Sequence, residues 1–83
     1  MYLHIGKNCA IKNDSIIGIF SYDNIKNTKE FKNLYENINE NINENIIDIS
    51  EKQQKSFILT KKDSIIKGYI TNIGTNTIKK RKM

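Results

Sequence analysis

Residues 55–71, from Lys55 to Thr71, read KSFILTKKDSIIKGYIT. Two runs rich in β-branched and aromatic residues, 55–60 and 64–71, flank a polar turn, KKDS, at 61–64. Such runs favour strands, and a short polar turn between two of them is typical of an antiparallel pair. The stretch therefore predicts a β-hairpin.

The beginning of the chain adds three shorter strand-forming runs: YLHI at 2–5, CAIK at 9–12 and SIIGIFSY at 15–22. Turn-forming residues separate them at 6–8 and at 13–14. The third run is apolar on both faces, which is typical of a strand covered on two sides. We therefore expect residues 15–22 to form the central strand of the sheet.

Between the two strand regions the apolar period becomes helical. Apolar residues recur at three- and four-residue steps from Phe31 to Ile42, which predicts a helix over 28–43. Asn27 or Thr28 is suited to its N-cap, because a side-chain oxygen there accepts a hydrogen bond from the first turn.

An Asn/Glu-rich segment, 36–54, contains the four-residue repeat ENINENINENI and overlaps a polar loop at 50–55. The repeat is typical of low complexity, and Asn is a poor helix former. We expect 36–54 to be a variable segment, and 39–54 to be mobile compared with the strands.

The chain ends in a basic tail, TNTIKKRKM at 75–83, which Thr75 or Asn76 is suited to cap as a short final helix. A chain of 83 residues has room for a single domain, 1–83. The predicted fold is α+β, with about five short, mainly antiparallel strands, one medium helix and a short C-terminal helix. So short a chain leaves edges and faces uncovered, which favours a homo-oligomer larger than a dimer.

Charge is distributed unevenly along the chain, whose net charge is +5. Residues 1–23 carry no net charge and residues 24–51 carry −3, whereas residues 52–83 carry +8. A C-terminal third of that sign is suited to phosphates or to an acidic partner.

Several classes of function are excluded by composition. One histidine, His4, and one cysteine, Cys9, do not supply a metal site, and no phosphate-binding loop or catalytic triad occurs. We expect His4 to be a hydrogen-bonded structural residue and Cys9 a small core residue. The chain is therefore not expected to be an enzyme or to need a cofactor. It has no long apolar run, so we expect no membrane span and a cytoplasmic protein.

Three strings carry a family resemblance: the opening MYLHIG followed by SIIGIF, the string KSFILT, and the ending TNTIKKR. In this order and spacing, nearly the whole chain resembles the small RemA/RemB family of bacterial extracellular-matrix regulators, on the RemB side. The resemblance implies a cytoplasmic, non-enzymatic regulator of matrix or biofilm genes, and the RemA branch binds DNA as a ring-shaped assembly. Where that branch has an arginine before the SIIGIF-like strand, this chain has Ser15.

These features support two hypotheses about function. The first is an oligomeric regulator that contacts the phosphate backbone of duplex DNA through basic residues of the hairpin and the tail: Lys52, Lys55, Lys61, Lys62, Lys79, Lys80, Arg81 and Lys82. The alternative is a protein-interaction module that binds no DNA and acts through a partner regulator. Ser15 and the single arginine favour the alternative, whereas the +8 third favours DNA.

Overall fold

The computed structural model describes residues 1–41 and 46–82. In chain order its elements are β1 (Tyr2–Gly6), β2 (Cys9–Lys12), the 3-10 helix η1 (Asn13–Ser15), β3 (Ile16–Ser21), α1 (Tyr22–Ile25), α2 (Lys29–Asn41), β4 (Ile46–Asp48), β5 (Ser56–Lys62), β6 (Ile65–Thr71) and α3 (Thr75–Lys82). This is an α+β fold, as predicted. None of the helices among these residues has the length and apolar character needed to cross a membrane.

The predicted hairpin is confirmed. β5 and β6 pair antiparallel, with Lys62 opposite Ile65 at the closed end. The two turn residues, Asp63 and Ser64, have φ values of 52° and 67°. Two positive φ angles in a two-residue loop match the right-handed twist of the strands that the loop joins.

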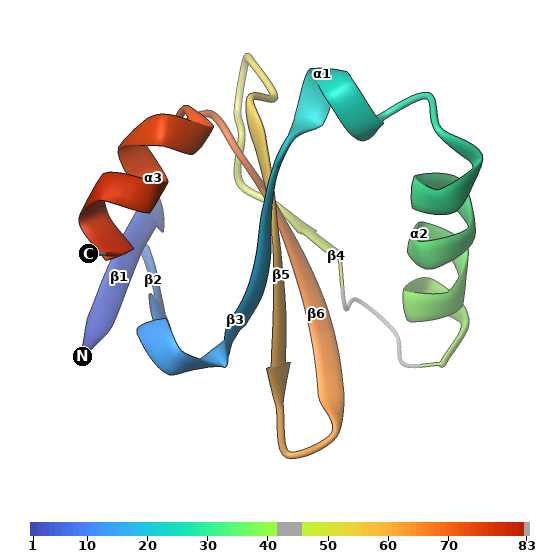
Figure 1. Ribbon diagram of the computed structural model, residues 1–83, viewed down its shortest axis with the longest axis horizontal. Coiled ribbons are helices and arrows are strands. Elements are labelled where there is room, and N and C mark those ends of the chain that lie inside the picture. Colours follow the sequence, from blue (N-terminus) through green and yellow to red (C-terminus); the bar gives the residue numbers. More distant parts are fainter. Residues whose placement is uncertain (42–45, 83) are drawn as a thin grey trace.

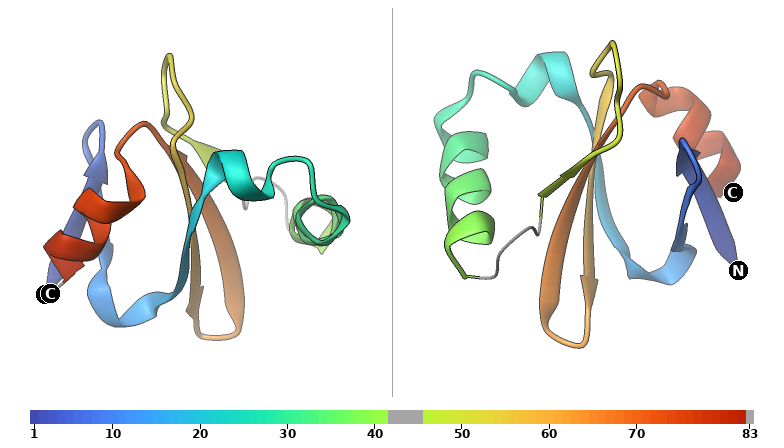
Figure 2. Two further views of the ribbon diagram at one scale, coloured as in Figure 1. Left: turned by 45° about the horizontal axis from the view of Figure 1, so that its top comes forward. Right: turned by 180° about the vertical axis from the view of Figure 1, so that it is seen from behind.

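The strands form two sheets. β1 and β2 make a two-stranded antiparallel sheet, and the other four strands follow the order β3-β5-β6-β4, with β4 parallel to β6. In Figure 1 the four-stranded sheet stands between two layers: β1, β2 and α3 cover one face, and α2 covers the other. Figure 2 shows α2 end-on beside the sheet and confirms this arrangement.

Each face of the four-stranded sheet has its own apolar core, because successive side chains of a strand point to opposite faces. Ile58 and Tyr69 pack on the side of β1, β2 and α3, against Leu3, Ile5 and Ile78. On the other face, Phe57 and Ile70 pack against Phe31 of α2. The rings of Phe57 and Phe31 meet edge to face, with 5.0 Å between their centroids.

Buried hydroxyl groups join the layers. The Thr71 hydroxyl donates a hydrogen bond to the carbonyl of Ile5, which links β6 to β1. The Ser56 hydroxyl donates to the Ile73 carbonyl at 2.7 Å and lies 3.0 Å from the Thr75 hydroxyl oxygen. These bonds satisfy polar groups that burial would otherwise leave unpaired.

The expectation that residues 15–22 form the central strand is wrong. β3 is an edge strand, and β5 and β6 occupy the centre. The two-sided apolar pattern of β3 has a different origin, because both faces of the whole sheet are covered. Ile19 packs into one core, while the Phe20 ring lies 6.4 Å from the Phe57 ring on the other face.

Two short elements were not predicted. Residues 22–25, expected to end a strand and begin a loop, form α1, and residues 46–48 of the expected variable segment form β4. A three-residue strand that pairs in parallel with a distant partner leaves almost no local pattern.

The predicted helix is confirmed over Lys29–Asn41, and its predicted end at residue 43 lies outside the described residues. Thr28 is the cap, since its hydroxyl oxygen accepts the Phe31 N–H at 3.1 Å. The final helix begins at Thr75. Its N-cap position is therefore occupied by Gly74, and not by Thr75 or Asn76 as predicted.

Candidate functional site

A groove lies between the two-stranded sheet and the β5–β6 hairpin. Its volume is about 400 Å³. Tyr2 and Ile11 supply part of its apolar lining from β1 and β2. Its lysine, hydroxyl and carboxylate groups come from Lys12, Ser15, Thr60, Lys62, Asp63 and Lys67.

Three lysines line this groove because the end of β2 lies beside the closed end of the β5–β6 hairpin. Lys12 is the last residue of β2, and the Ser15 hydroxyl donates to its carbonyl at 2.7 Å, which holds the η1 turn. Lys62 closes the hairpin, and Lys67 lies opposite Thr60 two pairs further along it. We call Lys12, Lys62 and Lys67 the groove lysines.

The groove lysines have no acidic partner within ion-pair distance among the described residues. The single ion pair found in that part of the chain joins Lys26 to Asp23, with 3.3 Å between nitrogen and oxygen. Asp63 is the one carboxylate among the described residues that line the groove. The Ser15 and Thr60 hydroxyls already donate to the carbonyls of Lys12 and Lys67. The groove therefore has an excess of positive charge, and lysine ammonium groups bind phosphate oxygens.

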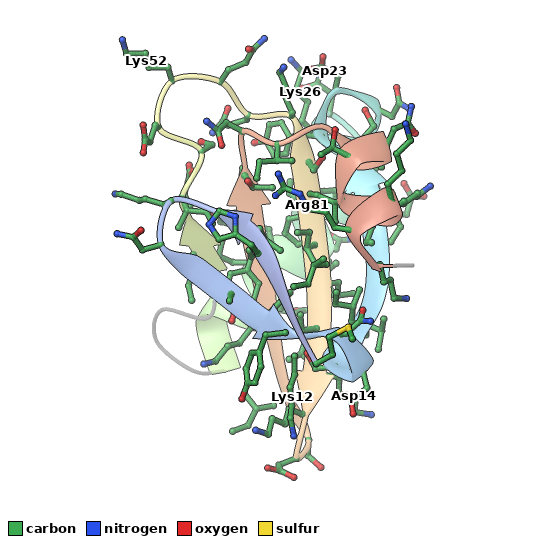
Figure 3. The ribbon with its side chains drawn as sticks, turned by 90° about the vertical axis from the view of Figure 1, so that its left-hand side faces the viewer. Lys12, Asp14, Asp23, Lys26, Lys52 and Arg81 are labelled. Carbon is green, nitrogen blue, oxygen red and sulfur yellow. The ribbon has the colours of Figure 1, made fainter. Side chains whose placement is uncertain are left out.

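The eight residues predicted as the site do not form one cluster. Lys52 and Lys55 precede β5, whereas Lys61 and Lys62 end it. A strand of seven residues separates these pairs by about 20 Å at about 3.3 Å per residue. In Figure 3, Lys52 and Lys12 stand at opposite ends of the molecule.

The basic residues of α3 point in different directions around the helix. Arg81 reaches back to β1, where its Nη1 donates to the His4 carbonyl at 3.0 Å (Figure 3). Lys79 and Lys82 line a second hollow beside β3, and Lys80 is exposed. The one arginine of the chain is thus engaged in holding α3 against β1.

His4 and Cys9 show no arrangement for chemistry. The His4 side chain is exposed, and its Nε2 lies 2.9 Å from the Lys7 carbonyl oxygen, so it is a hydrogen-bonded residue as predicted. Burial raises the pKa of the Cys9 thiol, which disfavours the nucleophilic thiolate form. Burial, and then the nearby Cys9, raises the pKa of Tyr69. The described residues contain no group of three or more side chains suited to hold a metal ion.

Sequence reasoning missed two of the three groove lysines as site residues. Lys12 and Lys67 lie 55 positions apart in the sequence, and each looks like an ordinary lysine in a strand. Only the packing of the β1–β2 sheet over the β5–β6 hairpin brings them together. The one local indication was Lys67 itself, a lysine in an otherwise mostly apolar strand.

No protein-family model and no curated protein matches this chain.

Proposed function

We propose that this protein is an oligomeric, cytoplasmic DNA-binding or DNA-associated regulator of extracellular-matrix or biofilm genes. It contacts the phosphates of duplex DNA through lysine-rich surface. The observation that carries the proposal is the groove, where three lysines without an acidic partner among the described residues line one concavity. The regulatory role rests on the resemblance to the RemA/RemB family.

The chemistry favours binding to the backbone over reading of bases. Lysine ammonium groups neutralise phosphates whatever the sequence, whereas guanine is read most often by arginine in a two-bonded arrangement. The single arginine, Arg81, is bound to the His4 carbonyl. We therefore expect binding with a strong dependence on salt and a modest sequence preference.

An assembly would compensate for the small number of contacts in one subunit. A homo-oligomer, ring-shaped as in the RemA branch, repeats the groove around its perimeter, and linked sites gain affinity by effective concentration. Native mass spectrometry at micromolar concentration tests this step. Detection of the 9.7 kDa monomer alone would contradict it.

The alternative function is a protein-interaction module that binds no DNA and acts through a partner regulator. One observation favours it: Ser15 occupies the position of an arginine in the DNA-binding branch, and its hydroxyl is engaged with the Lys12 carbonyl. A serine there removes one phosphate contact but leaves the three groove lysines in place.

The test is fluorescence anisotropy with a labelled duplex of random sequence at several salt concentrations. The variant replaces the three groove lysines together, K12Q, K62Q and K67Q. Each phosphate contact that is lost lowers the slope of log affinity against log salt by about 0.9. The matched control, K26Q, K29Q and K32Q, removes the same charge from α2 and the segment before it, on the other side of the sheet.

We expect the groove variant to weaken binding and lower the slope, and the control to retain both. Equal loss in the two triple variants would show that net charge alone attracts DNA. A wild-type protein that does not bind at about 50 mM salt, where counterion release is strong, would favour the partner-protein alternative. Circular dichroism checks that each variant is folded.

A third variant, K79Q, K80Q and K82Q, tests the predicted contribution of the tail while it keeps the Arg81 bond to β1. If it lowers the slope as much as the groove variant does, DNA contacts both surfaces. If the slope is unchanged, the α3 lysines serve another purpose, and Lys52, Lys55 and Lys61 are the next residues to replace.

A further inference from the structure

Among the described residues, one edge of β3 has no partner strand. β3 is the terminal strand of its sheet, and within the part of the chain that the structure describes no strand pairs with its outer side. A β-bulge between Ile16 and Gly18 interrupts its pairing with β5. Bulges of this kind are frequent at sheet edges.

The hydrogen-bond pattern shows which backbone groups face outward. The Tyr22 N–H donates to the Lys55 carbonyl at 3.0 Å, directly after the Ser21–Ser56 pair. Hydrogen-bonded and non-hydrogen-bonded pairs alternate along an antiparallel ladder. Tyr22 and Phe20 therefore face β5, and the backbone N–H and C=O of Ile19 point away from it, toward the open edge.

A hollow of about 520 Å³ runs along this edge. Ile16, Ile17, Gly18 and Ile19 line it from β3, and Lys79 and Lys82 line it from α3. The side chain of Ile17 is 56% exposed. None of the described residues that line the hollow is acidic, so it combines an unpaired strand edge, an exposed aliphatic residue and two cations.

The two lysines are held beside the edge because α3 is anchored. Ile78, completely buried, fixes the helix in the core next to β1 and β3. Arg81 binds the His4 carbonyl, and the Asn13 side-chain amide donates to the Lys82 carbonyl at 3.2 Å. The positive charge at the edge is thus a feature of the fold and not of a free tail.

Charge decides which strand suits this edge. A second copy of β3 would bring its own α3, so the lysines of both copies would meet and repel, which is how natural proteins prevent edge-to-edge pairing. An acidic strand would instead be attracted, because its backbone would pair with Ile19 and its carboxylates would lie near Lys79 and Lys82. We infer that the β3 edge docks an extended, acidic segment of a partner protein by strand addition.

The probe is a fluorescein-labelled octapeptide of alternating valine and glutamate, used with the full-length chain. A matched peptide with proline in place of two of the valines keeps every charge but removes two backbone donors, so it separates strand addition from attraction of charge. We expect micromolar-range anisotropy binding by the first peptide, and about tenfold weaker binding by the second.

Two protein variants complete the test. K79Q with K82Q should weaken binding of the valine–glutamate peptide about fivefold, since each exposed pair contributes modestly. K12Q with K67Q, in the groove, should leave peptide binding unchanged. Hydrogen exchange of the Ile19 amide, followed by NMR, should slow on binding.

Equal affinity for the proline peptide, unchanged exchange at Ile19, or equal loss in the two variants would each overturn the inference, as would the absence of binding. Peptide binding and the DNA contact of the groove are measured separately, since the groove contact is tested with duplex DNA and the groove variant. If K79Q with K82Q impaired DNA binding while peptide binding stayed the same, the edge lysines would belong to the DNA surface and the inference would be wrong.

Discussion

Replacing Gly68 with alanine tests how tightly the core beneath α2 is packed. Gly68 lies in β6 between Leu59 of β5 and Ile46 of β4. A Cβ atom at this position would stand 2.7 Å from the Cε1 and Cζ atoms of Phe57 and 2.9 Å from the Cδ1 of Ile46. Phe57 is completely buried and rests edge to face on Phe31, so its ring cannot swing aside without moving α2.

Because the Phe57 ring cannot move aside, G68A should lower the free energy of unfolding. Overpacking a well-filled core costs about 1–3 kcal/mol in the free energy of unfolding. In a domain of this size each kcal/mol lowers Tm by about 4–8 °C. G68A should therefore lower Tm by roughly 5–20 °C.

Gly18 offers a matched control with the same short contact. Its added Cβ would stand 2.6 Å from the Cε2 of Phe20. The Phe20 side chain, however, is 39% exposed and can rotate toward solvent. G18A should therefore cost less than about 1 kcal/mol.

Thermal and urea unfolding of both variants give Tm and the free energy of unfolding. Far-UV circular dichroism follows both, because the chain contains no tryptophan to report by fluorescence. Similar losses for G68A and G18A, or a loss below about 0.5 kcal/mol for G68A, the range of ordinary surface substitutions, would refute the packing argument.

Two further changes test local hydrogen bonds. T28A removes the oxygen that accepts the Phe31 N–H and should lower the free energy of unfolding by about 1 kcal/mol. T28S keeps this oxygen and should retain most of the stability. Thermal unfolding of both variants distinguishes loss of the cap from loss of the methyl group. Burial raises the pKa of Asp48, but hydrogen bonds from Ser50 and Gln54 outweigh burial and lower the pKa overall. The stability that this carboxylate contributes is therefore present above its unfolded pKa and is lost as the pH falls through its folded pKa. D48N should thus be less stable than wild type at pH 7, and the difference should shrink below about pH 4 in urea titrations; a difference that stays constant from pH 7 to pH 3 would contradict this.

The parts of the fold that sequence predicted are those with a local cause. The hairpin was predictable because β-branched runs flank a polar turn, and Asp63 and Ser64 adopt the positive φ angles that such a turn needs. The helix over Lys29–Asn41 was predictable from its apolar period and from Thr28 as a cap. In both cases the residues that specify the element lie within it.

The parts that were missed depend on distant partners. β3 looked central because apolar residues stand on both its faces, but strand order is fixed by which strands pair, and β5 lies between β3 and β6. β4 forms because Ile46 and Ile47 pair with residues of β6 that lie about twenty positions later in the sequence. Likewise, Lys12 and Lys67 line one groove because the β1–β2 sheet packs over the β5–β6 hairpin, which no local pattern in the sequence indicates.

The division of the basic third among several surfaces limits how strongly one subunit can hold DNA. The sequence gives residues 52–83 a net charge of +8, but the fold places Lys52 and Lys55 at one end, Lys79 and Lys82 beside β3, and Lys62 in the groove. Three groove lysines bound to three phosphates give a salt slope of about 2.7 per subunit, well below that of proteins making 6–10 contacts. If the protein binds DNA at physiological salt, the slope measured for wild type must therefore exceed this value and must fall toward it when the assembly is diluted to single subunits. A slope near 2.7 together with tight binding would mean that contacts other than phosphates hold the DNA, and the groove would not be the principal binding surface.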